Sequence, residues 1–269
     1  MYKYGFIGTG NMGSSLARAL DRQTNVAMSN RSPDKVKDLT DELGFKMSKN
    51  EDIAENSSYI MLGVKPQILP EVCEEIKEAL KRNKAQNSKS PIIITMAAGI
   101  KMEKLCELLG EKYPVIRIMP NTPVAIGKGV ILATKNNLVS DEDFEEFILD
   151  FKNAGSIKKI DENLIDAASV ISGCGPAYIY MYMESLAKAG EKLGLSYDLA
   201  KDLAIETTIG SASLAAASSN TLEELRIKVC SKGGSTIEGV RSLEESQLEK
   251  NVEKALGCAY NRTIELSRG

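Results

Sequence analysis

The chain has 269 residues, of which 43% are hydrophobic and 26% are charged, and its formal net charge is −3. A chain of this length can form one large domain or two modest ones, each with a buried core, and we expect two. The charge balance argues against a nucleic-acid or anionic-membrane binder. The apolar run that follows Met1 is too short for a signal peptide or a membrane span, so we expect a cytoplasmic protein.

Two residue counts restrict the chemistry. The five cysteines include no CxxC pair and their number is odd, which favours reduced thiols over a disulfide framework. Histidine is absent, so the chain has no Ser–His or Cys–His couple. It also lacks the commonest zinc ligand and the usual general base. We therefore expect no metal site and a reaction that proceeds without imidazole.

Residues 1–161 alternate short apolar runs with amphipathic stretches. This β-α-β-α order predicts a doubly wound, Rossmann-type α/β sheet with helices on both faces. An acidic helix from Ser140 to Lys152, with N-cap chemistry at its start, separates two additional strands. The expected strands are Tyr4–Gly8, Val26–Ser29, Tyr59–Val64, Ile92–Met96 and Val115–Ile118, all parallel and buried, then Val130–Thr134 and Ser156–Ile160.

Strand patterns cease after Asp161, and Ala-rich helical patterns follow. We therefore predict a second, all-helical domain over residues 162–269. Small residues recur in Ala187–Gly190 and Ile209–Ala217, which permits close helix packing within the fold or between subunits. The expected helices are Leu164–Ser172, Pro176–Leu193, Tyr197–Ser218, Thr221–Val229, Ser235–Leu243 and Leu248–Ser267.

A glycine-rich turn follows the first strand and opens a helix. In Gly8-Thr9-Gly10-Asn11-Met12-Gly13 the glycines allow a tight turn, the approach of a pyrophosphate and close packing of helix on strand. About 20 residues later, where an NAD site offers an acid to the ribose, the chain has Ser29, Asn30 and Arg31. These groups suit a 2′-phosphate, so we predict NADPH as cofactor with NADH as the alternative, unless Arg31 is only a solvated loop residue.

Two other segments follow strands at the edge where open α/β sheets bind ligands. In Gly63–Pro66, Pro66 fits the first position of a helix, and Lys65 is either a cofactor contact or a solvated side chain. Met119–Pro123 is a loop stiffened by two prolines, which alone predicts no function.

A second candidate site lies in the helical half. Cys230–Thr236 places hydroxyls, glycines and backbone N–H groups ahead of a helical pattern. Free N–H groups and the positive end of the helix dipole can hold a small anion such as a carboxylate there. Together with the glycine-rich turn, this segment indicates a cofactor site and an anionic-substrate site in one protein.

Five motifs resemble, in the same order, those of the pyrroline-5-carboxylate reductases. They are Gly5–Gly13, Val64–Pro66, Met119–Pro123, Ser172–Tyr178 and Gly233–Glu238, and the match covers nearly the whole chain. The resemblance implies reduction of the cyclic imine 1-pyrroline-5-carboxylate to L-proline by NAD(P)H, the last step of proline biosynthesis. It also implies a homodimer built by interlocking helices of the second domain, with five dimers in a ring in many members. Each substrate pocket in the family draws on the dimer interface, so a monomer is expected to be inactive.

The resemblance also assigns roles to individual residues. Thr236 would place its hydroxyl near the ring nitrogen, while the N–H groups of Gly234, Ser235 and Thr236 would hold the carboxylate. The Ser231 hydroxyl would hold the carboxylate with them, and Gly233 belongs to the same substrate segment. The implied cofactor contacts are Gly8, Thr9, Gly10, Asn11, Met12, Gly13, Ser29, Asn30, Arg31, Asn50, Val64, Lys65, Pro66, Ala97 and Asn121, and Ala98 and Gly99 would line the same crevice. Hydride addition to a protonated imine neutralises a cation, so this chemistry needs orientation of the ring and a grip on the carboxylate but no histidine base.

Three positions depart from the family pattern. Lys232 stands where proline is usual, Cys174 where a second serine is usual, and Ile227 where an acid is common. Lys232 adds a positive charge beside the carboxylate segment and removes the backbone constraint of proline. Cys174 is a packing change, because cysteine behaves as a small apolar residue.

Two other functions are compatible with this domain order. A β-hydroxyacid dehydrogenase also pairs a Rossmann domain with a helical one and carries a catalytic lysine on the interdomain helix. The corresponding stretch here, Ile171–Leu193, does contain Lys188 and Lys192. Its opening turn carries Cys174, Pro176 and Tyr178, which favours the imine reductases. A non-enzymatic relative would keep the nucleotide site, but the presence of Ser231, Gly234 and Thr236 argues against it.

Overall fold

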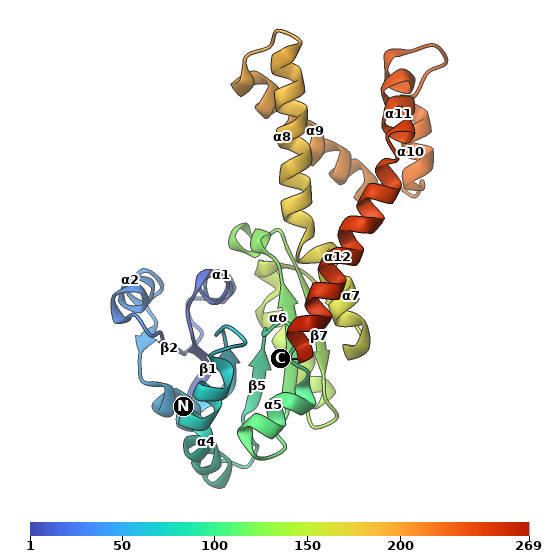
Figure 1. Ribbon diagram of the computed structural model, residues 1–269. Helices are drawn as coiled ribbons and strands as arrows, with labels where there is room; N and C mark the ends of the chain where they lie inside the picture. The colour runs from blue at the N-terminus through green and yellow to red at the C-terminus, as the bar shows by residue number, and fades with distance from the viewer. Residues whose placement is uncertain (269) are drawn as a thin grey trace. The chain divides into compact units, whose positions relative to one another are not determined.

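The computed structural model describes residues 1–268 and contains two compact units (Figure 1). Unit 1 comprises Met1–Cys174 together with the residues from Ala259 onward, and unit 2 comprises Gly175–Cys258. Unit 1 extends beyond residue 161 because the helix α7 (Glu162–Ser172) packs on two strands of the sheet. The division of the domains at residues 161 and 162 stays a prediction.

Unit 1 is built on one eight-stranded sheet of order β3-β2-β1-β4-β5-β6-β7-β8. Its strands are β1 (Tyr2–Ile7), β2 (Val26–Ser29), β3 (Lys46–Met47), β4 (Ser57–Leu62), β5 (Ile92–Thr95), β6 (Val115–Pro120), β7 (Gly129–Lys135) and β8 (Gly155–Lys159). Neighbouring strands pair in parallel except β6 and β7, which are antiparallel. The predicted doubly wound sheet is therefore confirmed, with its five parallel strands. Only β3 lacks a sequence signal, because two exposed residues leave no pattern.

Helices cover both faces of this sheet, which is why its strands are apolar on both sides (Figure 1). The first face packs against α1 (Asn11–Ala19), α2 (Pro33–Leu43) and α6 (Asp141–Asp150), and the second against α3 (Asn50–Asn56), α4 (Leu69–Gln86) and α5 (Met102–Leu109). Two short 3₁₀ helices, Thr122–Ile126 and Lys152–Ala154, join the later elements. The cores of the two faces contain, among others, Phe6, Leu16, Leu39 and Phe147 on the first and Ile60, Val72, Ile76 and Leu105 on the second.

Two helix starts test the sequence analysis. The predicted cap of the acidic helix is confirmed, because the N–H of Asp143 donates to the Ser140 hydroxyl at 3.0 Å. The expectation that Pro66 opens a helix is wrong. Pro66 lies in a turn closed by the N–H of Ile68 on the Lys65 carbonyl at 2.9 Å, and α4 begins only at Leu69.

Unit 2 is all-helical. It contains α8 (Gly175–Lys192), α9 (Tyr197–Ala217), α10 (Leu222–Val229), α11 (Ser235–Glu245) and the first part of α12 (Leu248–Arg268). Small residues let α8 and α9 pack closely, since a Cβ added to Gly190 would lie 2.8 Å from the Cβ of Ala200. Among the described residues, no helix is both long and apolar enough to cross a membrane.

The turn between α11 and α12 yields a stability prediction. Gln247 has a φ of 58°, in the left-handed region that strains residues with a Cβ by about 1–2 kcal/mol. Glycine removes that strain but costs about 0.5–1 kcal/mol of chain entropy, so Gln247→Gly should stabilise the chain by about 0.5–1 kcal/mol. Thermal unfolding measures this, with Gln86→Gly at the end of α4 as a control that should destabilise. A lower midpoint for Gln247→Gly would refute the strain.

Candidate dinucleotide and anion sites

The predicted cofactor residues meet at one edge of the sheet. The order of strands reverses between β1 and β4, and open α/β sheets bind ligands beyond the carboxyl ends of the strands at such a point. The glycine-rich turn follows β1, and the other predicted contacts follow β2, β4, β5 and β6, while Asn50 is the first residue of α3. The structure therefore brings together residues that are distant in sequence.

Backbone contacts require three glycines at this edge. Gly8 has a φ of 94°, and a Cβ there would lie 2.8 Å from the Cγ1 of Val64. A Cβ on Gly13 would lie 2.6 Å from the Gly8 carbonyl oxygen, and a Cβ on Gly63 would lie 2.3 Å from the same atom. Gly10 differs, because a Cβ there would meet no atom within 4 Å. Gly10 is thus free of packing constraints and leaves open space in front of α1.

Hydrogen-bond donors surround that space without partners in the described chain. Gly10 is the N-cap of α1 and supplies no side-chain cap, so the N–H groups of Asn11, Met12 and Gly13 are unpaired. The hydroxyl of Thr9 is buried and also makes no hydrogen bond within the described residues. An uncapped helix start with a spare hydroxyl suits the pyrophosphate of a dinucleotide. The residues present therefore fit this cofactor.

A cleft of about 470 Å³ runs from this turn to α2. Its lining adds two cations that the sequence analysis missed, Arg18 and Lys35. Arg18 pairs with Glu42 at 2.6 Å, and its hydrogen bond holds the pKa of the Glu42 carboxyl below its usual value. Lys35 has no ion pair within the described residues, which leaves its charge for a ligand. The lining residues are Thr9, Gly10, Asn11, Ser14, Arg18, Asn30, Ser32, Lys35, Asp38, Leu39 and Glu42.

The three residues predicted for a 2′-phosphate differ in their surroundings. Asn30 lines the cleft, and its Oδ1 accepts the N–H of Arg31 at 2.9 Å. Arg31 is exposed and does not line the cleft. Ser29 is buried, and its hydroxyl donates to Asn50 Oδ1, so this hydroxyl orients Asn50 inside the protein.

The remaining predicted contacts shape the same edge. Asn121 is buried and both ends of its amide are used: Oδ1 accepts the Val130 N–H at 2.8 Å, and Nδ2 donates to the Ser172 carbonyl at 2.9 Å. Ala97 is buried too, and its N–H donates to the Thr95 hydroxyl at 3.3 Å. Asn121 and Ala97 therefore contribute by holding their loops in place.

The predicted anion segment forms a tight turn in unit 2. The N–H of Gly234 donates to the Ser231 carbonyl at 3.0 Å, and Gly233 has a φ of 72°. The expectation that the Gly234 N–H is free for a carboxylate therefore needs correction, because this group closes the turn. Gly234 instead caps α11 without a side chain, so the N–H groups of Ser235 and Thr236 have no partner in the described chain.

Side chains converge on this helix start. A Cβ on Gly234 would lie 2.4 Å from the Oγ of Ser231, so the Ser231 hydroxyl lies beside the N-cap of α11. Thr236 is exposed, and its hydroxyl makes no hydrogen bond within the described residues. Lys232 occupies the second position of the turn, where proline is favoured because its fixed φ suits that conformation.

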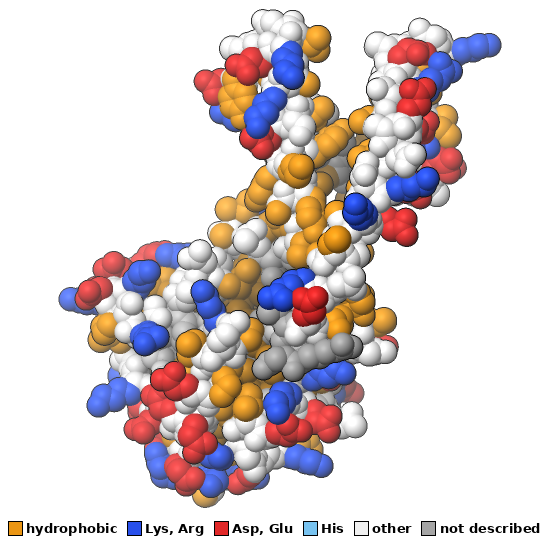
Figure 2. All heavy atoms as spheres, viewed as in Figure 1, with side chains coloured by type: hydrophobic (Ala, Val, Ile, Leu, Met, Phe, Trp, Pro, Cys, Tyr) orange, Lys and Arg blue, Asp and Glu red, His pale blue; other side chains and the backbone are white. Residues whose placement is uncertain are grey.

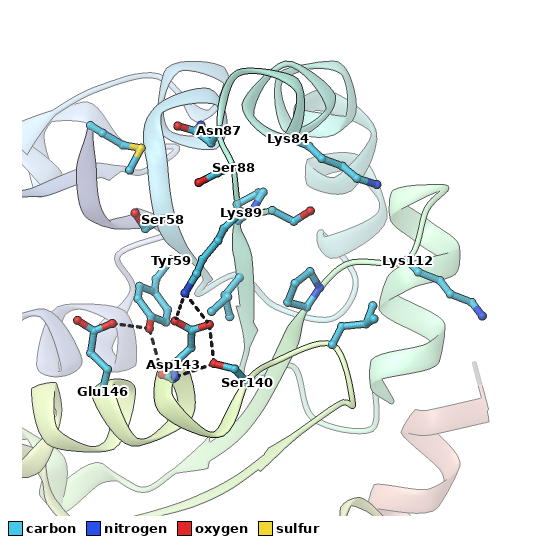
Figure 3. A pocket seen from close by; sticks show the side chains of 16 residues that line it. Ser58, Tyr59, Lys84, Asn87, Ser88, Lys89, Lys112, Ser140, Asp143 and Glu146 are labelled. Atoms are coloured by element: carbon cyan, nitrogen blue, oxygen red, sulfur yellow. Dashed lines mark hydrogen bonds and ion pairs between the residues drawn. The ribbon is translucent and has the colours of Figure 1, made fainter.

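A hollow of about 730 Å³ lies at the opposite edge of the sheet, by the amino ends of β4 and β5 (Figure 3). Several of its polar groups interact with one another. Lys89 lies 3.2 Å from Asp143, and the Tyr59 hydroxyl donates to Glu146 at 2.9 Å. Burial, with this hydrogen bond, raises the pKa of Tyr59 well above its usual value. The acids of this hollow are thus used by neighbouring side chains, and it lies away from the dinucleotide turn.

The chain is similar to known proteins over nearly its whole length. Residues 162–266 match the family model for pyrroline-5-carboxylate reductase dimerisation, and residues 3–99 match that for NADP oxidoreductases, coenzyme F420-dependent. A pyrroline-5-carboxylate reductase from Pisum sativum is 34% identical over 99% of this chain and 96% of its own length. The chain belongs to the pyrroline-5-carboxylate reductase family. Its Rossmann-type sheet and helical dimerisation domain are those of the family.

Solved structures give the same result. A pyrroline-5-carboxylate reductase from Coxiella burnetii has a TM-score of 0.89 at 31% identity, covering 99% of this chain and 98% of that one. One from Plasmodium falciparum, solved with NADP bound, has a TM-score of 0.86 at 31% identity over the same shares. A 3-hydroxyisobutyrate dehydrogenase from Mycobacterium tuberculosis covers 82% of this chain and 72% of its own at 12% identity and a TM-score of 0.53, and shares the fold alone.

The open space at Gly10 yields a binding prediction. Gly10→Ala should fold normally, because its φ of −66° suits alanine and the methyl group meets no atom. The methyl group would occupy the space that a pyrophosphate needs, so we expect the Kd for NADPH to rise about 10-fold or more. Fluorescence titration and thermal unfolding measure the two effects. Gly13→Ala, whose Cβ collides with Gly8, is the contrast and should lose stability as well. Unchanged NADPH binding in a folded Gly10→Ala would place the phosphates elsewhere.

Proposed function

We propose that the chain reduces 1-pyrroline-5-carboxylate to L-proline with NADPH as the hydride donor, the last step of proline biosynthesis. The observation that carries this proposal is that α1 and α11 each begin at a glycine N-cap followed by N–H groups without partners in the described chain, in a member of this reductase family. The start of α1 fits a dinucleotide pyrophosphate, and the start of α11 fits a small carboxylate.

The start of α11 supplies the grip on the substrate. The N–H groups of Ser235 and Thr236 and the hydroxyl of Ser231 are assigned to the carboxylate, because they converge on a helix start that has no other acceptor in the described chain. Lys232 adds a positive charge to the same turn. This arrangement orients a ring that has one negative group, and it leaves the imine end free to react.

The Thr236 hydroxyl is assigned to the ring nitrogen. It is exposed, carries one donor and two acceptor sites, and lies on the first turn of the helix assigned to the carboxylate. In the protonated imine the ring nitrogen is an N–H donor, so the hydroxyl oxygen can accept from it and keep the proton on the nitrogen as the charge is neutralised. No histidine is needed for this step, in keeping with a chain that has none.

The cofactor site is assigned to unit 1. The N–H groups of Asn11, Met12 and Gly13 are to hold the pyrophosphate. Asn30 and Lys35, which line the cleft, are assigned to the 2′-phosphate together with the exposed Arg31 next to Asn30. NADPH, when bound, supplies the hydride. Asn50 and the segment Val64–Pro66 are assigned to the rest of the cofactor because they share this edge of the sheet, and Ala97 and Asn121 are assigned to holding the loops that line it.

Unit 2 has the surface of a subunit interface (Figure 2). Its helices expose large apolar side chains that a monomer would leave in water, including Met181 at 69%, Ile209 at 62% and Leu222 at 76%. The dimerisation model also matches these helices. We infer a homodimer through unit 2, with a ring of five dimers as the larger assembly to test by measuring the mass in solution.

The direct test of this function is oxidation of NADPH by the purified protein with racemic 1-pyrroline-5-carboxylate, followed by loss of nicotinamide absorbance and repeated with NADH. We expect rapid oxidation only when the imine is present, and proline as the product by mass spectrometry. NADPH that binds without being oxidised would refute the proposal and indicate a non-catalytic relative.

Cofactor choice gives the first mutational prediction. Arg31→Ala should raise the KM for NADPH about 10-fold and leave that for NADH nearly unchanged, because only NADPH carries the phosphate that a guanidinium would hold. Arg22→Ala, an exposed arginine before β2, is the matched control. An equal change for both cofactors would remove Arg31 from the phosphate site.

The proposed contact of Thr236 with the ring nitrogen gives the second mutational prediction. Thr236→Ala should lower kcat about 10- to 100-fold with little change in the Kd for NADPH, because it removes one polar contact at the reacting atom. Thr236→Ser keeps the hydroxyl and should retain most of the activity. Thr236 would have no part in the reaction if the alanine variant turned over at the normal rate.

A further inference from the structure

A charged side chain lies fully buried beneath the edge of the sheet where the cofactor residues meet. Arg117, in β6, is 0% exposed and faces α7. Its Nη2 lies 2.6 Å from Asp166 Oδ1, and its Nη1 lies 3.7 Å from Glu162 Oε1. Its Nε and Nη1 make no hydrogen bond within the described residues. In sequence Arg117 interrupts an apolar strand, Val115–Ile118, and has no other assigned role.

Stability does not explain an arginine at this position. A buried ion pair gains little over well-packed apolar residues, because removing both charges from water costs as much as their attraction returns. Donors left without partners cost about 1–3 kcal/mol more. A pair of apolar side chains would serve the core at least as well. The role of Arg117 therefore depends on the segments that its two acidic partners contact.

The first partner leads to Asn121. Asp166 lies in the middle of α7, and the carbonyl of Ser172 at the end of that helix accepts the Nδ2 of Asn121 at 2.9 Å. Asn121 follows β6 four residues after Arg117 and also binds the N–H of Val130. The helix α7 is thus tied to β6 at two levels, once by the ion pair and once by the Asn121 amide.

The second partner leads to the turn after β5. Oε1 of Glu162, the atom facing Arg117, accepts the N–H of Met102 at 2.7 Å. Met102 is the first residue of α5, and the turn Ala97–Gly99 ends three residues before it. The positive end of the α5 dipole also stabilises a carboxylate at this position. One guanidinium therefore faces the two acids that fix α7 and the start of α5.

We propose that Arg117 is a positioning residue: through Asp166 and Glu162 it fixes α7 and the start of α5 against the sheet, and thereby sets the turn Ala97–Gly99 and the Asn121 loop at the cofactor edge. This inference rests on the proposed function, which makes this edge of the sheet the cofactor site. The contacts of Arg117 do not depend on that function. Arg117 is out of reach of any ligand, so its effect on the reaction is indirect. Loss of the network should disturb orientation of the cofactor more than its affinity, because other residues are assigned to the phosphates.

The test removes both charges at once, since a single substitution would leave a buried charge unpaired. The double variant R117M/D166L keeps the core apolar and should fold with a midpoint near that of the wild type. We expect faster amide hydrogen exchange in residues 97–102 and 162–172 of the chain without ligand. We further expect kcat to fall about 10-fold while the Kd for NADPH changes less than about threefold.

Two more variants separate the parts of the network. Glu162→Gln keeps an oxygen for the Met102 N–H, whereas Glu162→Ala removes it, so the alanine variant should show the larger rise in exchange over residues 97–102. The matched control is Lys104→Ala with Glu107→Ala, which removes an exposed ion pair on α5 and should change neither exchange at the edge nor kcat.

The outcomes distinguish this inference from the function on which it rests. A wild-type protein that does not oxidise NADPH with the imine refutes the proposed function, while the exchange experiment still measures the network. Unchanged exchange and unchanged kcat in a folded R117M/D166L would overturn the inference. An R117M/D166L that unfolds would overturn it as well, because the pair would then be needed for stability and not for position.

Discussion

The carbonyl oxygen of Gly8 is the atom around which unit 1 is organised. Two other glycines, Gly13 at the start of α1 and Gly63 after β4, come so close to it that neither has room for a Cβ. This contact sets how α1 meets the sheet at the point where the strand order reverses. The uncapped donors of α1, the open space at Gly10 and the cleft toward α2 all follow from that placement. A side chain at any of the three positions would displace α1 and with it the phosphate site, although every N–H donor would still be present.

The fold was within reach of the sequence because its strongest signals are local. Apolar runs, Ser140 as a cap and glycine breaks are properties of neighbouring residues, and they locate all the strands longer than two residues. The direction of β7 is not local: nothing in Val130–Thr134 indicates that it runs antiparallel to β6. The start of α4 also depends on which of two prolines, Pro66 or Pro70, enters the helix, and the turn at Lys65 decides this.

The candidate sites were predictable in outline but not in their hydrogen bonds. A glycine pattern predicts an anion-binding turn. It does not indicate that the Gly234 N–H closes the turn or that the Ser29 hydroxyl donates to Asn50. Such details depend on partners 3 to 21 residues away. Lys35 and Arg117 were missed for a similar reason, since one is an ordinary helix lysine and the other a single charge in an apolar run. Only burial and neighbouring groups distinguish them.

The antiparallel pairing of β6 with β7 places the loops that follow these two strands at opposite edges of the sheet. Because β7 runs the other way, the loop that follows it belongs to the amino-end edge, where Leu138 and Ser140 line the hollow with Tyr59. Leu138 is 54% exposed there and lies across the sheet from the glycine-rich turn. A fluorescent label or a surface tether attached at Leu138 would therefore leave the cofactor edge untouched. The same reversal that gives the sheet its mixed topology thus provides a handle for immobilising or tracking the enzyme while it works.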